Sequence, residues 1–116
     1  RELGYSMEDF SVFGDVDSVP MRYVMLMEAT LPEGLDPGAV AAELDKGLCE
    51  GNPSYGDKVA KGMLDHLRLL FLQPETYLLY RDVMISKGAA SAQLKPPRIL
   101  NEIQRRFFMA LLEDDQ

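Results

Sequence analysis

Apolar residues along the chain follow two spacings, one typical of strands and one typical of helices. Within residues 8–14 apolar and polar positions alternate, which predicts a short strand. Residues 23–30 and 67–73 are apolar at nearly every position, so both are predicted to be interior strands. Residues 99–100 form a short apolar pair after two prolines and are expected to add a short edge strand.

Four segments have apolar residues at helical spacing, and most begin with a residue that caps helices. Asp36 and Asn52, each followed by a proline, are predicted N-caps of two helices with almost no linker between them. A third helix is predicted over residues 74–87, and a last one after Asn101. The residues that these helices are expected to direct toward the core are Val40, Leu44, Leu48, Tyr55, Val59, Met63, Thr76, Leu79, Tyr80, Val83, Ile103, Phe107, Ala110 and Leu111.

The predicted order of elements is ββααβαβα, without repeats or an internal linker. A chain of 116 residues has the ordinary length of one domain and can bury a single core. We therefore predict an α+β fold, one domain over residues 1–116, in which helices cover a small mixed sheet of three or four strands. The acidic end, residues 113–115, is expected to fray.

Glu28 is the charged residue in an otherwise apolar predicted strand. A carboxylate at such a position lies near the exposed end of its strand, or it is buried opposite a cation elsewhere in the fold. The sequence leaves both alternatives open.

Charge and cysteine content narrow the classes of partner and compartment. The net charge of −7 and the pI of 4.6 argue against general binding to nucleic acid or to an anionic membrane. No apolar run approaches the ~18 residues of a transmembrane helix. Cys49 is the single cysteine and has no internal partner, which favours a reducing compartment, and we predict the cytoplasm.

Residue chemistry alone gives no complete active site. His66 has no second histidine or cysteine at metal-ligand spacing, so it is predicted to be structural and no metal site is predicted. Cys49 has no histidine near it in sequence that would make it a nucleophile. The phosphate-binding motifs GxGxxG and GxxxxGK[ST] and the nucleophile motif GxSxG are absent from the sequence.

One segment nevertheless combines features that can present a charge. Residues 88–98 read GAASAQLKPPR, a loop of small residues followed by Lys95 and two prolines. Pro96 and Pro97 have no amide donor and disfavour helical geometry at the residue before them, so Lys95 is expected on an extended, stiffened arm. The alternative is an ordinary connection with a solvated lysine.

Three segments carry motifs that can be compared with known families by their order and spacing. The first contains Asp9-Phe10, the run VFGDVDSVP at 12–20, Tyr23-Val24 and Glu28; the second is Asn52-Pro53-Ser54-Tyr55; the third has Gly88, Ala89, Gln93, Lys95, Pro97 and Arg98. Together they resemble the motifs DFTSYAD with IPGHYVLFWE, N-x-x-Y and GAxxxQxKxPR of the auxin-responsive Gretchen Hagen family of acyl acid amido synthetases. The resemblance covers roughly residues 8–100. Departures at Met21-Arg22, Leu26-Met27 and Val59 indicate a divergent member.

The resemblance implies that this chain is the C-terminal lid domain of a larger adenylate-forming ligase. A start at Arg1 instead of methionine fits a piece of a longer protein. In such a ligase the N-terminal adenylation domain, which this chain does not contain, holds ATP with Mg2+, activates a small carboxylic acid as an acyl adenylate, and transfers it to an amino acid. The isolated domain is then expected to be inactive.

The resemblance also assigns roles to three residues of the arm. Lys95 matches the family's lid lysine and is expected to be catalytic, near the nucleotide phosphates. Gln93 and Arg98 are expected to support it at the bound nucleotide. The alternative function is a free-standing interaction module that docks a partner through its sheet edge or last helix. The sequence leaves the acyl acid and the amino acid undefined.

Overall fold

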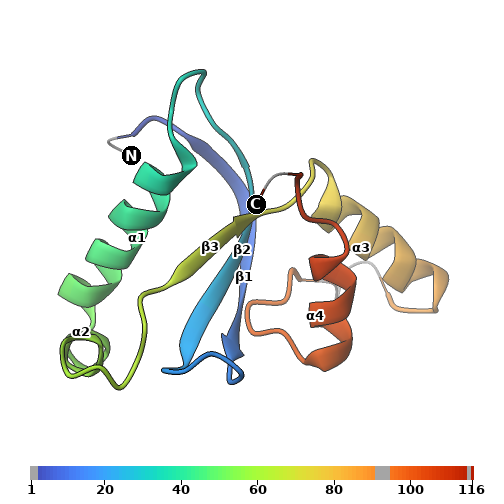
Figure 1. Cartoon of the computed structure of the whole chain (residues 1–116). Coiled ribbons are helices and arrows are strands. Elements are labelled where there is room, and N and C mark those ends of the chain that lie inside the picture. The colour runs from blue at the N-terminus through green and yellow to red at the C-terminus, as the bar shows by residue number, and fades with distance from the viewer. Residues whose placement is uncertain (1–2, 91–94, 115) are drawn as a thin grey trace.

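The computed structural model describes residues 3–90, 95–114 and 116, which form a three-stranded sheet and four helices in the order ββααβαα (Figure 1). The elements are β1 (Ser6–Asp15), β2 (Arg22–Thr30), α1 (Pro37–Gly51), α2 (Pro53–Ala60), β3 (Arg68–Phe71), α3 (Thr76–Ser86) and α4 (Glu102–Met109). The predicted α+β class is confirmed. The expected fourth strand is reduced to one parallel bridge between Val12 and Ile99.

The sheet is mixed, as predicted, and β2 lies in its centre. β1 and β2 form an antiparallel pair that runs from Ser6 opposite Thr30 to Asp15 opposite Arg22. β2 and β3 are parallel, so the chain must cross from one end of the sheet to the other between them. Helices α1 and α2 form this crossover.

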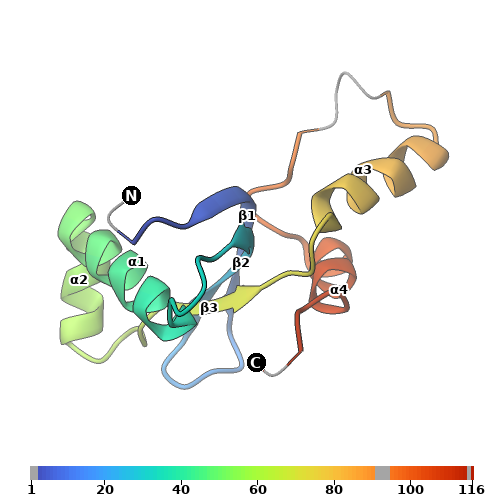
Figure 2. The ribbon, with the colours of Figure 1, turned by 90° about the horizontal axis from the view of Figure 1, so that it is seen from above.

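Helices cover both faces of the sheet, and the apolar residues therefore form two clusters instead of the single core that was expected. Figures 1 and 2 show α1 and α2 on one side of the sheet and α3 and α4 on the other. Side chains alternate along β2 because the period of a strand is two. Val24 and Leu26 pack with Phe108 of α4, whereas Met27 packs with Val40 of α1.

β3 is an edge strand, so the prediction that residues 67–73 form an interior strand is wrong. Its side chains are apolar because both faces are covered, with Leu70 in one cluster and Phe71 in the other. The C-terminal segment covers its free edge. Leu72 forms an antiparallel bridge with Leu112, and the Glu113 amide donates to the Phe71 carbonyl at 2.9 Å. The Gln116 side chain amide also donates to that carbonyl, at 2.7 Å. Glu113 is therefore paired and not frayed.

The predicted helix starts are confirmed by their capping bonds. The Asp36 carboxylate accepts from the Gly38 amide at 3.1 Å, and the Asn52 side chain accepts from the Tyr55 amide at 3.2 Å. Asn101 and Gln104 form a reciprocal capping box at the start of α4. Among the described residues no helix is long and apolar enough to cross a membrane.

Two predicted helix faces are rotated from their expected directions. Leu79 and Ile103 were expected in the core but are 45% and 80% exposed. The helices α3 and α4 instead meet through rings, since Phe108 lies 5.0 Å from Tyr77 and 5.2 Å from Tyr80 between centroids. Aromatic packing between the two helices, which the spacing within one helix does not reveal, decides which side faces inward.

The contrast between Phe108 and Ile103 gives a prediction about stability. Phe108→Ala removes a fully buried ring and is expected to lower the free energy of unfolding by about 3–5 kcal/mol. Ile103→Ala, on the same helix but exposed, is the matched control and should change it by less than about 0.5 kcal/mol. Urea denaturation followed by circular dichroism measures both values. Equal losses would show that α4 packs through the other face.

Candidate functional site

The segment that carries Lys95 lies along β1, at the edge of the sheet (Figure 2). The Val12 amide donates to the Arg98 carbonyl at 2.6 Å, and the Leu100 amide donates to the Val12 carbonyl at 3.0 Å. Pairing begins only after the two prolines, which have no amide to contribute. Residues 98–100 thus anchor the C-terminal end of the arm on the sheet.

Ser11 connects the arm to helix α3. Its hydroxyl is fully buried, donates to the Pro97 carbonyl and lies 2.7 Å from the Tyr77 hydroxyl. Because a carbonyl can only accept, the Ser11 proton goes to Pro97 and Tyr77 donates to Ser11. Burial raises the pKa of Tyr77, so the phenol stays neutral at physiological pH.

Arg98 also attaches the arm to β1. Its guanidinium donates to the Asp9 carboxylate and, at 2.7 Å, to the Phe10 carbonyl. It also lies 4.4 Å above the centre of the Phe10 ring. These contacts show that Arg98 holds the arm on β1. A contact between Arg98 and nucleotide remains a prediction.

Lys95 is exposed, and in the described part of the chain its amine makes no ion pair. With Pro96 it forms one wall of a hollow of about 290 Å³. The other wall belongs to α3 and is formed by Tyr77, Leu78, Tyr80 and Arg81. The arm is held at Pro97 and Arg98, while the cation next to the prolines is left available. Gln93 lies outside the described residues.

Glu28 fixes the position of α3. Its two carboxylate oxygens accept from the amides of Glu75 and Tyr77, each at 3.0 Å. Glu75 has a φ of 66° and does not cap the helix with its own side chain, so a residue from β2 provides the cap. The strand position is near the end of β2, one of the two alternatives, but the partners are the amides of a helix N-terminus instead of a cation.

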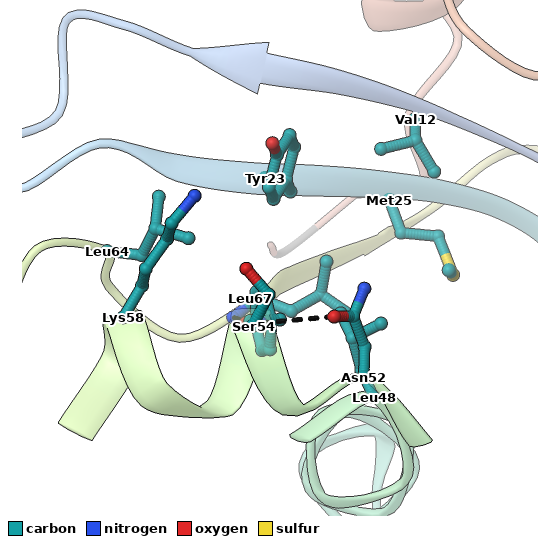
Figure 3. Close-up of a pocket in the computed structure, with 10 residues that line it drawn as sticks. Val12, Tyr23, Met25, Leu48, Asn52, Ser54, Lys58, Leu64 and Leu67 are labelled. Atoms are coloured by element: carbon teal, nitrogen blue, oxygen red, sulfur yellow. Dashed lines mark hydrogen bonds between the residues drawn. The ribbon is translucent and has the colours of Figure 1, made fainter. Parts of the chain in front are cut away.

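A second hollow, of about 360 Å³, lies on the opposite face of the sheet, between β2 and α2 (Figure 3). Met25 and Tyr23 extend from β2 toward α2, and Lys58 and Asn52 line the helical side. Its walls are mainly apolar, and no described residue lines both hollows. Val12, which lines this second hollow, is also the residue of β1 that bonds Arg98 and Leu100, so one strand contacts both the second hollow and the arm.

A polar network supports the second hollow. The Asp45 carboxylate accepts from the Tyr55 hydroxyl at 2.9 Å and from the Leu67 amide at 3.1 Å, and it pairs with His66 at 2.5 Å. Partial burial acts to raise the pKa of Asp45, but the bonds from His66, Tyr55 and Leu67 outweigh it, and the pKa falls below its ordinary value. His66 and the tyrosine of the N-x-x-Y motif thus join α1, α2 and the start of β3.

Comparison with known proteins agrees with the fold and with the family that the sequence motifs suggested. A profile of the GH3 family C-terminal domain matches residues 1–104. The chain belongs to the GH3 family. It is 27% identical over 107 residues to the 4-substituted benzoates-glutamate ligase GH3.12 of Arabidopsis thaliana, a match that covers 84% of this chain and 19% of that protein.

Two solved GH3 structures share the fold. The GH3.15 acyl acid amido synthetase superposes with a TM-score of 0.79 at 19% identity, over 95% of this chain and 21% of that one. The AtGH3.15 acyl acid amido synthetase in complex with 2,4-DB gives a TM-score of 0.76 at 22% identity, with the same coverage. This chain therefore spans about a fifth of the length of the GH3 proteins that it matches.

Several residues that build the site were not identified from sequence. Ser11 and Tyr77 bond across 66 positions of the chain, and Asp45 meets His66 across 21. For Ser11 a signal existed, since it occupies a position of β1 that faces the same way as Phe13 and would normally be apolar. No comparable local pattern marks Tyr77 or Asp45.

The lowered pKa of Asp45 gives a prediction about acid stability. A carboxylate with a depressed pKa in the folded state stabilises the protein above its ordinary pKa of 3.8, and this contribution is lost as the pH falls through the lower folded value. Asp45→Asn should therefore destabilise the domain at pH 6, and the difference from wild type should shrink below pH 3.8. Urea unfolding at pH 6 and at a pH below 3.8 measures the difference in the free energy of unfolding between wild type and Asp45→Asn.

Asp57→Asn is a matched control for that experiment, because Asp57 is an exposed carboxylate that pairs with Lys61 one turn away. It should cost little at pH 6. A difference between wild type and Asp45→Asn that stays constant down to the acid transition would contradict the assigned network.

Proposed function

We propose that this GH3 chain is the C-terminal lid domain of an ATP-dependent acyl acid amido synthetase, which activates a carboxylic acid as an acyl adenylate and conjugates it to an amino acid. The observation that carries the proposal is the Lys95 amine on its anchored arm, exposed while the neighbouring cation Arg98 is occupied by Asp9 and Phe10. Membership of the family and the ligase relative support it.

The chemistry of adenylation explains why a mobile domain would carry such a lysine. A carboxylate oxygen of the acid attacks the α-phosphorus of ATP, the bond to the β-phosphate oxygen breaks, and pyrophosphate leaves. Negative charge builds on the phosphoryl oxygens during this step, and a preorganised cation there is worth about 3 kcal/mol of barrier. Lysine suits the role because its point charge on a flexible stem can follow moving oxygens.

The anchored arm would turn movement of the whole domain into placement of one charge. Pro96 and Pro97 restrict the backbone, and the contacts of Pro97 and Arg98 with β1 hold it. When the lid closes, the amine arrives at a place defined by the fold, and water is excluded from the acyl adenylate. The Lys95 side chain then loses less conformational entropy in reaching the transition state, which lowers the activation free energy.

ATP and Mg2+ would be bound mainly by the N-terminal adenylation domain, which is also the partner of this domain. Within the described ranges no group of three His, Cys, Asp or Glu side chains is placed to hold a metal ion. The Mg2+ ligands would therefore be the nucleotide phosphates and residues of the adenylation domain. The isolated lid would be inactive, and the use of ATP together with a single unpaired cysteine fits a cytoplasmic enzyme.

The structure gives less support to the alternative of a free-standing docking module. The two edges of the sheet are covered in part, β1 by residues 98–100 and β3 by the C-terminal segment. Phe108 is fully buried, and Phe107 packs against the same core. The large apolar side chains that α4 leaves exposed are Ile103 and Met109, and two such residues are ordinary for a protein surface.

Substitution of Lys95 in the full-length synthetase tests the proposal. Lys95→Ala should reduce the rate of acyl-adenylate formation by about 100-fold, measured as ATP–pyrophosphate exchange, with nearly unchanged affinity for the carboxylic acid. Because Lys95 is exposed, the melting temperature should stay within error. Lys87→Ala, an exposed lysine at the end of α3, is the matched control. Full exchange activity in Lys95→Ala would exclude the proposed role.

A further inference from the structure

Arg81 and Lys95 face the same hollow from different parts of the fold. Arg81 belongs to α3, whereas Lys95 belongs to the arm, and both line the hollow of about 290 Å³. The other described residues that line it are Tyr77, Leu78, Tyr80 and Pro96, and most of the surface of the hollow is apolar. Among the described lining residues two are cations and none is a carboxylate, in a chain whose net charge is −7.

The surroundings of the two cations favour an anionic ligand. In the part of the chain that the structure describes, neither Arg81 nor Lys95 has an ion-pair partner. Tyr77 donates its hydroxyl proton to Ser11, and its raised pKa keeps it from adding negative charge. Two like charges that line one hollow repel each other, and an anion between them relieves that repulsion.

We propose that Arg81 is a second phosphate-binding residue, which forms with Lys95 a site for the oligophosphate of the nucleotide. The inference rests on the proposed function and adds a residue to it. A polyanion such as a triphosphate or the leaving pyrophosphate matches two cations better than a carboxylate, which carries one charge. The planar guanidinium of Arg81 can hold two oxygens at once, while Lys95 contributes a point charge.

Arg81 and Lys95 would have different roles because different parts of the fold hold them. Arg81 follows Tyr77 by one helical turn on α3, whose N-terminus is fixed to β2 by Glu28. Lys95 stands on the arm, which Ser11 and Arg98 anchor to β1. Arg81 is therefore a positioning residue for the phosphates, and Lys95 supplies charge at the reacting oxygens.

Binding of inorganic tripolyphosphate to the 116-residue chain tests the site without catalysis. Amide shifts of residues 77–81 in NMR spectra should report binding in the millimolar range. Arg81→Gln and Lys95→Gln should each weaken it at least 5-fold, and Arg106→Gln should not, because Arg106 is an exposed arginine paired with Glu102 on another helix. Loss of binding with Arg106→Gln, or none with Arg81→Gln, would overturn the inference.

Sodium benzoate serves as the comparison ligand in the same titration. The amides of residues 77–81 should respond to tripolyphosphate and not to benzoate at equal ionic strength. A response to benzoate alone would show that the hollow binds carboxylates and would overturn the phosphate assignment.

Kinetics of the full-length synthetase separate the inference from the proposed function. Arg81→Gln should raise the KM for ATP about 10-fold in ATP–pyrophosphate exchange, with an unchanged KM for the acid, and Arg81→Lys should restore part of the loss. If Lys95→Gln slows exchange while Arg81→Gln matches wild type, the inference fails and the lid proposal stands. If the protein forms no adenylate but tripolyphosphate binding needs both cations, the phosphate site stands and the lid proposal fails.

Discussion

The two hydrogen bonds of the Glu28 carboxylate connect the sheet to helix α3, which reaches the arm through Tyr77. Both oxygens accept amides at the first turn of α3, where helix amides have no partner within the helix. The negative charge also lies at the positive end of the helix dipole. Tyr77, whose amide Glu28 binds, then reaches Ser11, and Ser11 binds the Pro97 carbonyl. One carboxylate of β2 thereby sets the distance between α3 and the arm.

This arrangement contrasts a cation that holds the fold together with one that has no ion-pair partner among the described residues. Arg98 uses its guanidinium on Asp9, on the Phe10 carbonyl and over the Phe10 ring. Lys95, three residues earlier, is kept out of such contacts by two prolines that stiffen the backbone between them. The clamp and the free charge thus belong to the same short segment, and anchoring one of them presents the other.

Local chemistry predicted the parts of this structure that depend on near neighbours in sequence. The caps at Asp36, Asn52 and Asn101 follow from side chains that reach amides two or three residues ahead, and these predictions are confirmed. The inward sides of α3 and α4 depend on rings from both helices, so spacing within either one failed at Leu79 and Ile103. Lys95 was identified by motif and prolines, whereas Arg81 became visible only through the shared hollow.

The acidic composition of the chain gives the cationic hollow a further consequence. A domain with a net charge of −7 is repelled on average by a bound nucleotide, and this long-range repulsion is screened beyond about 8 Å at physiological salt. At shorter range the local charges decide, and there Arg81 and Lys95 attract phosphate beside apolar walls. An approach with any acidic face toward the nucleotide is disfavoured, while an approach with the hollow toward it is favoured. In the proposed lid role, the negative charge of the whole domain and the positive charge at the hollow would thus act together to favour one orientation toward the nucleotide.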